Sequence, residues 1–207
     1  MGILKSFFSQ TRRPEGLLGK LMLSTMNSGH ASMADWGLSA LPALSPEQVI
    51  DLGCGAGRNA GELLKRYPHA VVTALDYSPL SVESAQKYNA SQVRAGRCLV
   101  VQGDVSDLHL PAAQYDLATA FETIYFWPGL ENCFSQVARI LKPGGLFLIC
   151  NESDGTDPAG VKFEKIIDGM SLYTPEKIAS ALHAAGFSSA SIIRHDQKNW
   201  IAVLAHK

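Results

Sequence analysis

A run of glycines preceded by an aspartate is the part of this 207-residue chain whose residue types best suit ligand binding. It follows a short apolar segment that is typical of a buried strand, and it reads Asp51-Leu52-Gly53-Cys54-Gly55-Ala56-Gly57. Glycines let the backbone turn tightly and approach a ligand without side chains in the way. We therefore expect the loop at 53–57 to lie against a small molecule.

Two further carboxylates stand at the ends of expected strands. Asp76 closes a segment rich in β-branched residues, and Asp104 follows the next apolar segment in Gly103-Asp104-Val105. A carboxylate at the position of Asp76 can accept two hydrogen bonds from a ribose diol. Asp104 is placed to meet an adenine edge. Together with the glycine run, these acids indicate a nucleotide-like ligand.

The spacing of the glycines distinguishes between classes of nucleotide. A dinucleotide-binding turn reads GxGxxG, whereas this chain reads GxGxG and has Arg58 where the third glycine would stand. One alternative is an NAD(P)-dependent oxidoreductase, because Tyr173 and Lys177 have the Tyr-x-x-x-Lys spacing of short-chain dehydrogenases. Pro175 lies inside that match, at an expected helix start. The glycine spacing and this proline both disfavour the alternative.

The elements that must position these residues alternate along the chain. We expect strands at 49–52, 70–75, 97–102, 115–121 and 146–150, and helices at 58–67, from 79, at 130–141 and at 174–186. Two closing strands, 188–195 and 200–205, predict an antiparallel edge hairpin. The fold class is α/β, a Rossmann-like doubly wound, seven-stranded, mostly parallel sheet. Residues 1–45 form an N-terminal helical extension or lid, and residues 46–207 form the main domain. The segment 152–172 is expected to be a mobile cover.

Composition excludes several classes of function. The chain has 18 Lys and Arg against 19 Asp and Glu, which argues against a nucleic-acid partner. Its four cysteines have no CxxC spacing, so no metal site is expected. No apolar run reaches a membrane-spanning length, and we expect a cytoplasmic protein without stable membrane association. A monomer or a homodimer fits equally well.

The motifs in order resemble the class I S-adenosylmethionine-dependent methyltransferases, and in particular the single-domain type that acts on small molecules. The segment 49–59 is similar to the first motif of that family, and Asp76 matches its ribose-binding acid. Further matches are the adenine-side motif at 103–105, the start of the fourth strand at 115–117 and the turn before the fifth strand at 141–145. The resemblance covers residues 46 to 207.

The resemblance implies a site for S-adenosylmethionine, which leaves as S-adenosylhomocysteine. The residues expected to contact it are Asp51, Gly53, Gly55, Gly57, Asn59, Asp76, Tyr77, Ser78, Gly103, Asp104, Val105, Phe121 and Glu122. In this interpretation Asp51 helps to hold the methionine amino group, directly or through water. Asp76 binds the ribose hydroxyls and Tyr77 flanks the adenine. Asp104 accepts from the adenine N6, while Phe121 and Glu122 lie beside the sulfonium.

The acceptor side is less recognisable, because the sulfonium is itself the activated donor and a protein base is needed only for some acceptors. Glu122 and Tyr125 follow the fourth strand, and His30 lies on the N-terminal helix. These three are the candidate catalytic residues, with Tyr173 as a further residue that could face the pocket. We expect a small-molecule acceptor, methylated on N, O, S or C. A non-catalytic protein that binds S-adenosylmethionine is the second alternative.

Overall fold

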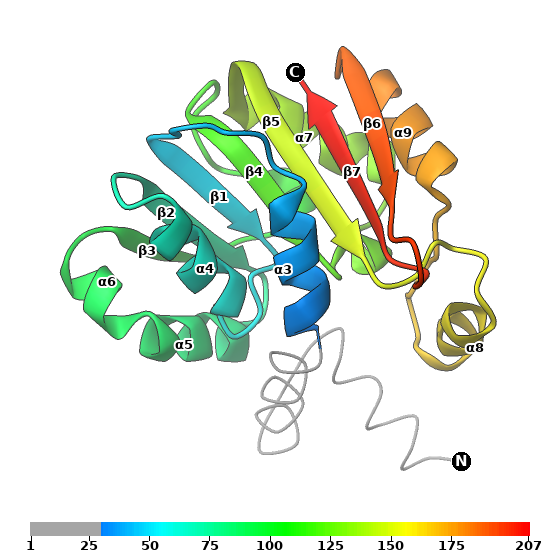
Figure 1. Cartoon of the computed structure of the whole chain (residues 1–207). Helices are drawn as coiled ribbons and strands as arrows, with labels where there is room; N and C mark the ends of the chain where they lie inside the picture. Colours follow the sequence, from blue (N-terminus) through cyan, green and yellow to red (C-terminus); the bar gives the residue numbers. More distant parts are fainter. Residues whose placement is uncertain (1–29) are drawn as a thin grey trace.

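A seven-stranded sheet with the order β3-β2-β1-β4-β5-β7-β6 forms the centre of the protein in a computed structural model that describes residues 30–207 (Figure 1). The strands β1 to β5 are parallel, and β7 pairs antiparallel with both β5 and β6. The strands are β1 (Gln48–Leu52), β2 (Val71–Asp76), β3 (Cys98–Gln102), β4 (Tyr115–Phe121), β5 (Leu141–Asn151), β6 (Ser189–Arg194) and β7 (Ile201–His206). The predicted fold class, including the edge hairpin, is confirmed.

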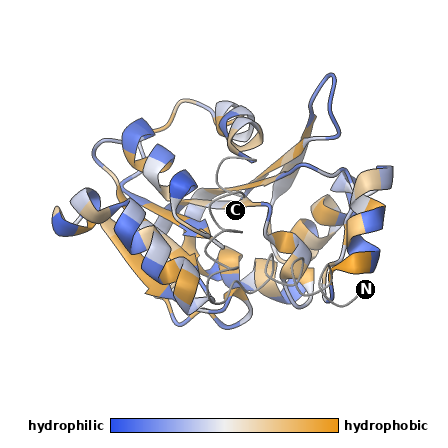
Figure 2. Cartoon of the chain, turned by 90° about the horizontal axis from the view of Figure 1, so that it is seen from below, coloured by the Kyte–Doolittle hydropathy of each residue, from blue (hydrophilic) through white to orange (hydrophobic). Residues whose placement is uncertain are grey.

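Helices cover both faces of this sheet. They are α3 (Ala31–Ser39), α4 (Arg58–Arg66), α5 (Pro79–Tyr88), α6 (Ala90–Arg94), α7 (Leu130–Ile140), α8 (Pro158–Ile166) and α9 (Pro175–Ala184), with single 3-10 turns η1 (Val105–Asp107) and η2 (Ile124–Phe126). Figure 1 shows α3 and α4 on one face and α7 and α9 on the other. Hydrophobic residues are concentrated in the strands and on the helix sides that meet them (Figure 2). Strands covered on both faces are expected to be buried along their length, and every residue of β1 after the first is buried, including Asp51.

Two differences from the expected elements concern helices. The segment 152–172, interpreted as a mobile cover, contains α8, which begins with Asp157 as its cap and Pro158 at its first position. The Asp157 carboxylate accepts from the Gly160 N–H at 2.8 Å, so the sequence held an ordinary helix start signal there. The short helix α6 was also not expected, because its five residues are too few to show a periodic pattern.

The helix α3 packs directly against β5. Met33 is fully buried, and it belongs to the same hydrophobic cluster as Val49 of β1 and Leu148 of β5. Most of the predicted extension at 1–45 lies outside the described residues, and the boundary at residue 45 stays a prediction. Among the residues that are described, we find no helix with the length and apolar character needed to cross a membrane.

Close packing between α3 and β5 leads to a stability prediction. A Cβ atom added to Gly37 would lie 2.4 Å from Cys150 Sγ, so Gly37→Val should push the helix off the strand. We expect a loss of about 1–3 kcal/mol in the free energy of unfolding, measured by urea denaturation. Ser39→Ala, on the exposed end of the same helix, is the control. An unchanged midpoint for Gly37→Val would contradict this packing.

Candidate functional site

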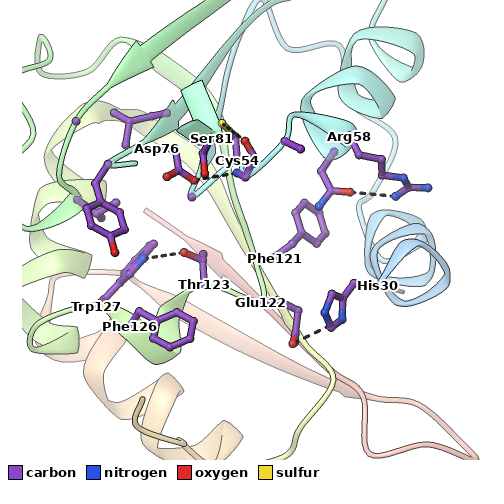
Figure 3. A pocket seen from close by; sticks show the side chains of 18 of the residues that line it. His30, Cys54, Arg58, Asp76, Ser81, Phe121, Glu122, Thr123, Phe126 and Trp127 are labelled. Atoms are coloured by element: carbon purple, nitrogen blue, oxygen red, sulfur yellow. Dashed lines mark hydrogen bonds and ion pairs between the residues drawn. The ribbon is translucent and has the colours of Figure 1, made fainter. Parts of the chain in front are cut away.

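A cavity of about 200 Å³ lies at the carboxyl ends of β1, β2 and β4 (Figure 3). This is the edge of a parallel sheet at which ligands are expected to bind. Its wall includes most of the residues predicted to contact a cofactor, namely Gly53, Gly55, Asn59, Asp76, Tyr77, Gly103, Asp104, Val105, Phe121 and Glu122. The topology therefore brings residues from four separate motifs to one place.

The glycine turn after β1 is tied to the neighbouring strand. The backbone N–H groups of Gly53 and Cys54 both donate to the Leu75 carbonyl, at 2.8 and 2.9 Å. Gly57 has φ 87°, and a Cβ there would lie 2.8 Å from the Ala85 Cα of α5. A side chain at this position would be strained and would also collide with backbone. Gly57 thus lets α4 and α5 approach the turn, but it does not itself line the cavity.

Asp76 connects the end of β2 to the glycine turn. Its Oδ2 accepts from the Gly55 N–H and its Oδ1 from the Ser78 N–H, both at 2.9 Å. The side chain is 7% exposed and lies on the cavity wall. Burial raises the pKa of this carboxyl, and the backbone N–H groups of Ser78 and Gly55 oppose that shift. The residue can therefore hold the turn and still present carboxylate lone pairs to a ligand.

Two predicted contact residues lie behind the wall. Ser78 is fully buried and caps α5 by accepting from the Ser81 N–H. Ser81 lines the cavity, whereas Ser78 does not. Asp51 is 1% exposed, and its Oδ1 accepts from Thr119 Oγ1 at 2.8 Å. The other oxygen, Oδ2, has no hydrogen-bond partner in the described part of the chain. Burial raises the pKa of Asp51 to about 7.

A second, larger cavity adjoins the first one. It measures about 640 Å³ and is lined from η2, from the end of β5, from α8 and from the turn between β6 and β7. His30 and Glu122 line both cavities, so they stand where the two meet. The candidate residue Tyr125 lines the second cavity, whereas Tyr173 lies on the wall of neither.

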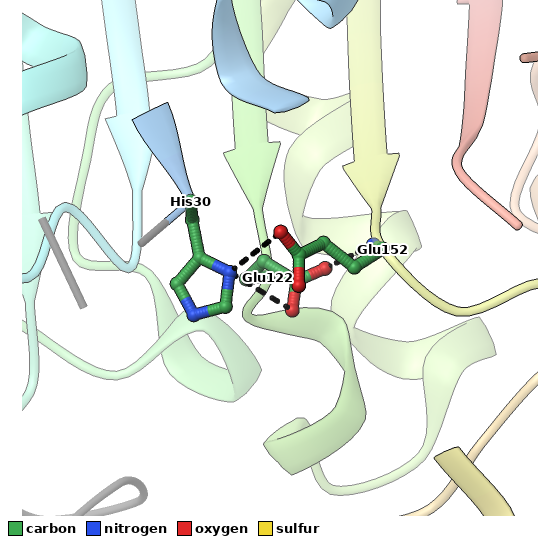
Figure 4. A group of neighbouring side chains, drawn as sticks. All are labelled: His30, Glu122 and Glu152. Carbon is green, nitrogen blue, oxygen red and sulfur yellow. Dashed lines mark hydrogen bonds and ion pairs between the residues drawn. The ribbon is translucent and has the colours of Figure 1, made fainter. Parts of the chain in front are cut away.

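Three side chains converge at this junction (Figure 4). His30 Nδ1 lies 3.2 Å from Glu152 Oε1 and 3.9 Å from Glu122 Oε2. The imidazole is at ion-pair distance from both carboxylates, but no aligned hydrogen bond to Nδ1 forms among the described residues. Burial lowers the pKa of His30, but the two carboxylates outweigh it and leave the pKa raised. The three ligand atoms lie within 4.8 Å of one another, a spacing at which a metal ion could also be held, although no metal site was expected.

Glu122 is held in an unusual conformation. It has φ 55°, a left-handed value that is uncommon outside glycine and often marks a functional position. Its Oε1 accepts from the Tyr125 hydroxyl at 2.9 Å and also from the Glu152 N–H, which leaves Oε2 directed at His30. Burial raises the pKa of Glu122 to about 7, opposed by His30 and these hydrogen bonds. A carboxyl with this pKa exchanges its proton near neutral pH.

Comparisons with known proteins identify the family to which this chain is similar. Residues 49–145 match a family model described as a methyltransferase domain. A sterol 24-C-methyltransferase from Gibberella zeae is 30% identical over 149 residues, which cover 68% of this chain and 39% of that protein. The chain belongs to the class I S-adenosylmethionine-dependent methyltransferases.

Solved structures show the same fold in other proteins. A putative methyltransferase in complex with the Haloferax volcanii Trm112 methyltransferase activator superposes with a TM-score of 0.81 at 18% identity, covering 99% of this chain and 97% of that chain. Human N-acetylserotonin methyltransferase in complex with SAM superposes with a TM-score of 0.74 at 21% identity, covering 90% and 55%. The chain spans about two fifths of the length of the first sterol methyltransferase that it matches.

The candidate site also includes residues that the sequence interpretation did not include. Thr123, Phe126 and Trp127 line the first cavity, and the Trp127 Nε1–H donates to Thr123 Oγ1 at 3.2 Å. Glu152 completes the cluster with His30 and Glu122. The signal for Glu152 was available, because it directly follows the last residue of β5, at the same sheet edge as the other strand ends.

Proposed function

We propose that this protein transfers the methyl group of S-adenosylmethionine to a small-molecule acceptor. The observation that carries the proposal is the junction of the two cavities. One cavity holds the glycine turn and Asp76, the other is open to a second molecule, and both are lined by His30 and Glu122. Two reactants placed on either side of the junction would be aligned for in-line displacement, in which positioning supplies much of the acceleration.

The residues of the first cavity fit S-adenosylmethionine, which supplies an activated methyl group on a sulfonium. Asp76 would accept from the ribose hydroxyls and Asp104 from the adenine amino group, with Tyr77 beside the ring and Val105 donating its N–H. Gly53 and Gly55 would approach the methionine part, and Asn59, Gly103 and Phe121 would complete the wall. Among the described residues Asp51 Oδ2 is a buried acceptor without a hydrogen-bond partner, and the methionine ammonium would satisfy it directly or through water.

The acceptor is proposed to be a small molecule that occupies the second cavity. A volume of about 640 Å³ is in the range of small-molecule sites. The matched relatives include sterol 24-C-methyltransferases, and a solved structural neighbour is a human enzyme named for N-acetylserotonin. These names support a small acceptor for this chain as well. Tyr125 and His30 would lie on the acceptor side, because both line the second cavity.

Calorimetric titration of the full chain with S-adenosylmethionine, S-adenosylhomocysteine and NADH tests the cofactor. We expect micromolar binding of the first two, which is about −8 kcal/mol, and no heat from NADH. Binding of NADH alone would overturn the proposal in favour of an oxidoreductase. A non-catalytic binder is distinguished by labelled methyl donor incubated with a small-molecule extract, because only an enzyme would transfer the label.

Cofactor affinity should depend on pH through Asp51. With its pKa at about 7, the carboxyl loses its charge as pH falls, and with it the attraction for the methionine ammonium. We expect S-adenosylhomocysteine to bind about tenfold more weakly at pH 6 than at pH 7.5. Asp51→Asn should flatten this dependence. Glu122→Gln is the control that should retain it, since Glu122 also has a pKa of about 7.

The hydroxyl of Tyr125 should matter for turnover and not for cofactor binding. Its hydrogen bond orients Glu122. Tyr125 is 3% exposed and does not line the first cavity. Tyr125→Phe is expected to lower the rate of labelled methyl transfer about tenfold, with the affinity for S-adenosylhomocysteine unchanged. His30→Ala should likewise lower the rate of methyl transfer and leave the affinity for S-adenosylhomocysteine unchanged. Loss of cofactor affinity in either variant would place that residue on the cofactor side.

A further inference from the structure

The cluster of His30, Glu122 and Glu152 and the walls of the second cavity together carry information about the acceptor. This inference rests on the proposed function and concerns the chemistry of the second reactant. The cluster stands where the methyl group would pass from one cavity to the other, because two of its members line both. Charges there act on whichever acceptor atom receives the methyl group.

The charged groups that face the junction are mainly acidic. Two carboxyl groups face a single imidazole, so with both carboxyls ionised the cluster stays negative even when His30 carries a proton. On the described wall of the second cavity, Lys198 is the one basic side chain besides His30, and its Nζ lies over the Trp200 ring, 3.7 Å from the centre. Asp157 adds another carboxylate, which is already engaged by Ser153 Oγ and the Gly160 N–H.

This charge pattern discriminates between acceptors. A hydroxyl acceptor that reacts as an oxyanion is disfavoured there, because its negative charge would lie beside two carboxylates. A neutral amine does the reverse, because it becomes positive as it is methylated. Nearby carboxylates then stabilise the charge that develops in the transition state.

The remaining wall of the second cavity is largely apolar, although Ser153, Gln197 and Asn199 also line it. Its apolar part is formed by side chains of η2, α8 and the segments beside them, namely Phe126, Ala159, Phe163, Ile167, Met170 and Trp200. Such a wall favours a hydrophobic molecule by removing its surface from water. Aromatic rings near the junction add attraction for a cationic group.

We propose that the acceptor is an amine carried on an apolar body, with its nitrogen at the junction beside Glu122 and Glu152 and its body against the wall formed by α8. The amine binds as an ammonium and first gives one N–H proton to a carboxylate of the cluster. The freed lone pair then forms the new N–C bond, and the electrons of the breaking C–S bond stay on sulfur as a thioether. The positive charge thus passes from sulfur to nitrogen, and the methylated product leaves as an ammonium or loses a further proton to water.

The test uses three probes of one shape and different charge, namely phenylbutylamine, phenylbutanol and phenylbutyrate. Each is titrated into the full chain saturated with S-adenosylhomocysteine. We expect the amine to bind about tenfold more tightly than the alcohol, and the carboxylate to bind least. Equal affinities, a preference for the carboxylate or no binding of the amine would overturn the inference. Failure of S-adenosylhomocysteine itself to bind would instead refute the proposed function.

Three variants connect the preference to the cluster and the wall. Glu152→Gln should weaken the amine about fivefold and leave the alcohol unchanged, since Glu152 is partly exposed and its charge is partly screened. Glu131→Gln, on the exposed start of α7, is the matched control and should change neither. Phe163→Ala should weaken amine and alcohol by the same factor. An amine preference that survives in Glu152→Gln and Glu122→Gln alike would overturn the assignment to this cluster.

A transfer assay separates an amine from an alkene, which also becomes positive on methylation. Labelled methyl donor is supplied with phenylbutylamine or with phenylbutene. We expect label on nitrogen, identified by the mass of the product. Label on the alkene with none on the amine would contradict the inference. If neither compound is methylated, the order of the affinities of the amine, the alcohol and the carboxylate decides.

Discussion

Replacement of Asp76 by alanine should weaken S-adenosylhomocysteine binding at least about 100-fold, the largest expected effect on the cofactor side. The variant removes the proposed acceptor of both ribose hydroxyls, and each hydrogen bond to a charged group is worth about 1.5–3 kcal/mol. It also frees the N–H of Gly55, which Asp76 Oδ2 now accepts. The glycine turn would lose part of its support along with the ligand contact.

Calorimetry measures this effect, and far-ultraviolet circular dichroism shows whether the variant is folded. Asp104→Ala is the comparison, since Asp104 also lines the cavity and would lose the adenine contact together with its hydrogen bonds from the Ser106 N–H and Oγ. We expect that variant to weaken binding about tenfold. A folded Asp76→Ala protein with unchanged affinity would remove the ribose assignment.

Glu122→Gln should have the largest effect on turnover. The substitution keeps the size of the side chain and an oxygen for the Tyr125 hydroxyl, but it removes the charge beside His30. Removing one charged group positioned beside the reacting atoms costs about 100-fold or more, and we expect a loss of about that size. Because S-adenosylhomocysteine carries no sulfonium charge, its affinity should change little.

The measurement is the initial rate of labelled methyl transfer at saturating donor, paired with calorimetry on the same preparation. The backbone of Glu122 already has φ 55°, and glutamine bears the same cost there as glutamate, so a folding defect is not expected. Parallel losses of rate and of S-adenosylhomocysteine affinity would show that Glu122 serves the cofactor and not the acceptor.

Much of the fold was accessible from sequence because its signals are local. The strand at 115–121 has the bounds that were expected, and the helix after Gly57 ends one residue before the expected position, at Arg66. Asp76 could be placed at the cavity because a strand end and an acid at that spacing leave few alternatives. The helix α8 is not apparent from the sequence because the many Asp and Gly residues of the segment 152–172 are typical of a loop and obscure the Asp157-Pro158 start signal.

The acceptor side was harder to predict, because its parts are far apart in sequence. No pattern links His30 to Glu152, and only the pairing of β4 with β5 brings Glu122 and Glu152 together. The position of Ser78 behind the wall depends on the rotation of α5, which a strand-and-turn pattern does not specify. Local motifs therefore predict the residues that line the first cavity, whereas long-range packing forms the second cavity.

The position of His30 and Glu152 relative to the matched range of the family model has an evolutionary consequence. The family model matches residues 49–145, so both lie outside it, as do α8 and the turn between β6 and β7 that line the second cavity. The half of the sheet from β1 to β3 can stay constant while the segments around β5 to β7 diverge. Relatives that share one methyl donor would thereby acquire different acceptors through changes in the segments that line the second cavity.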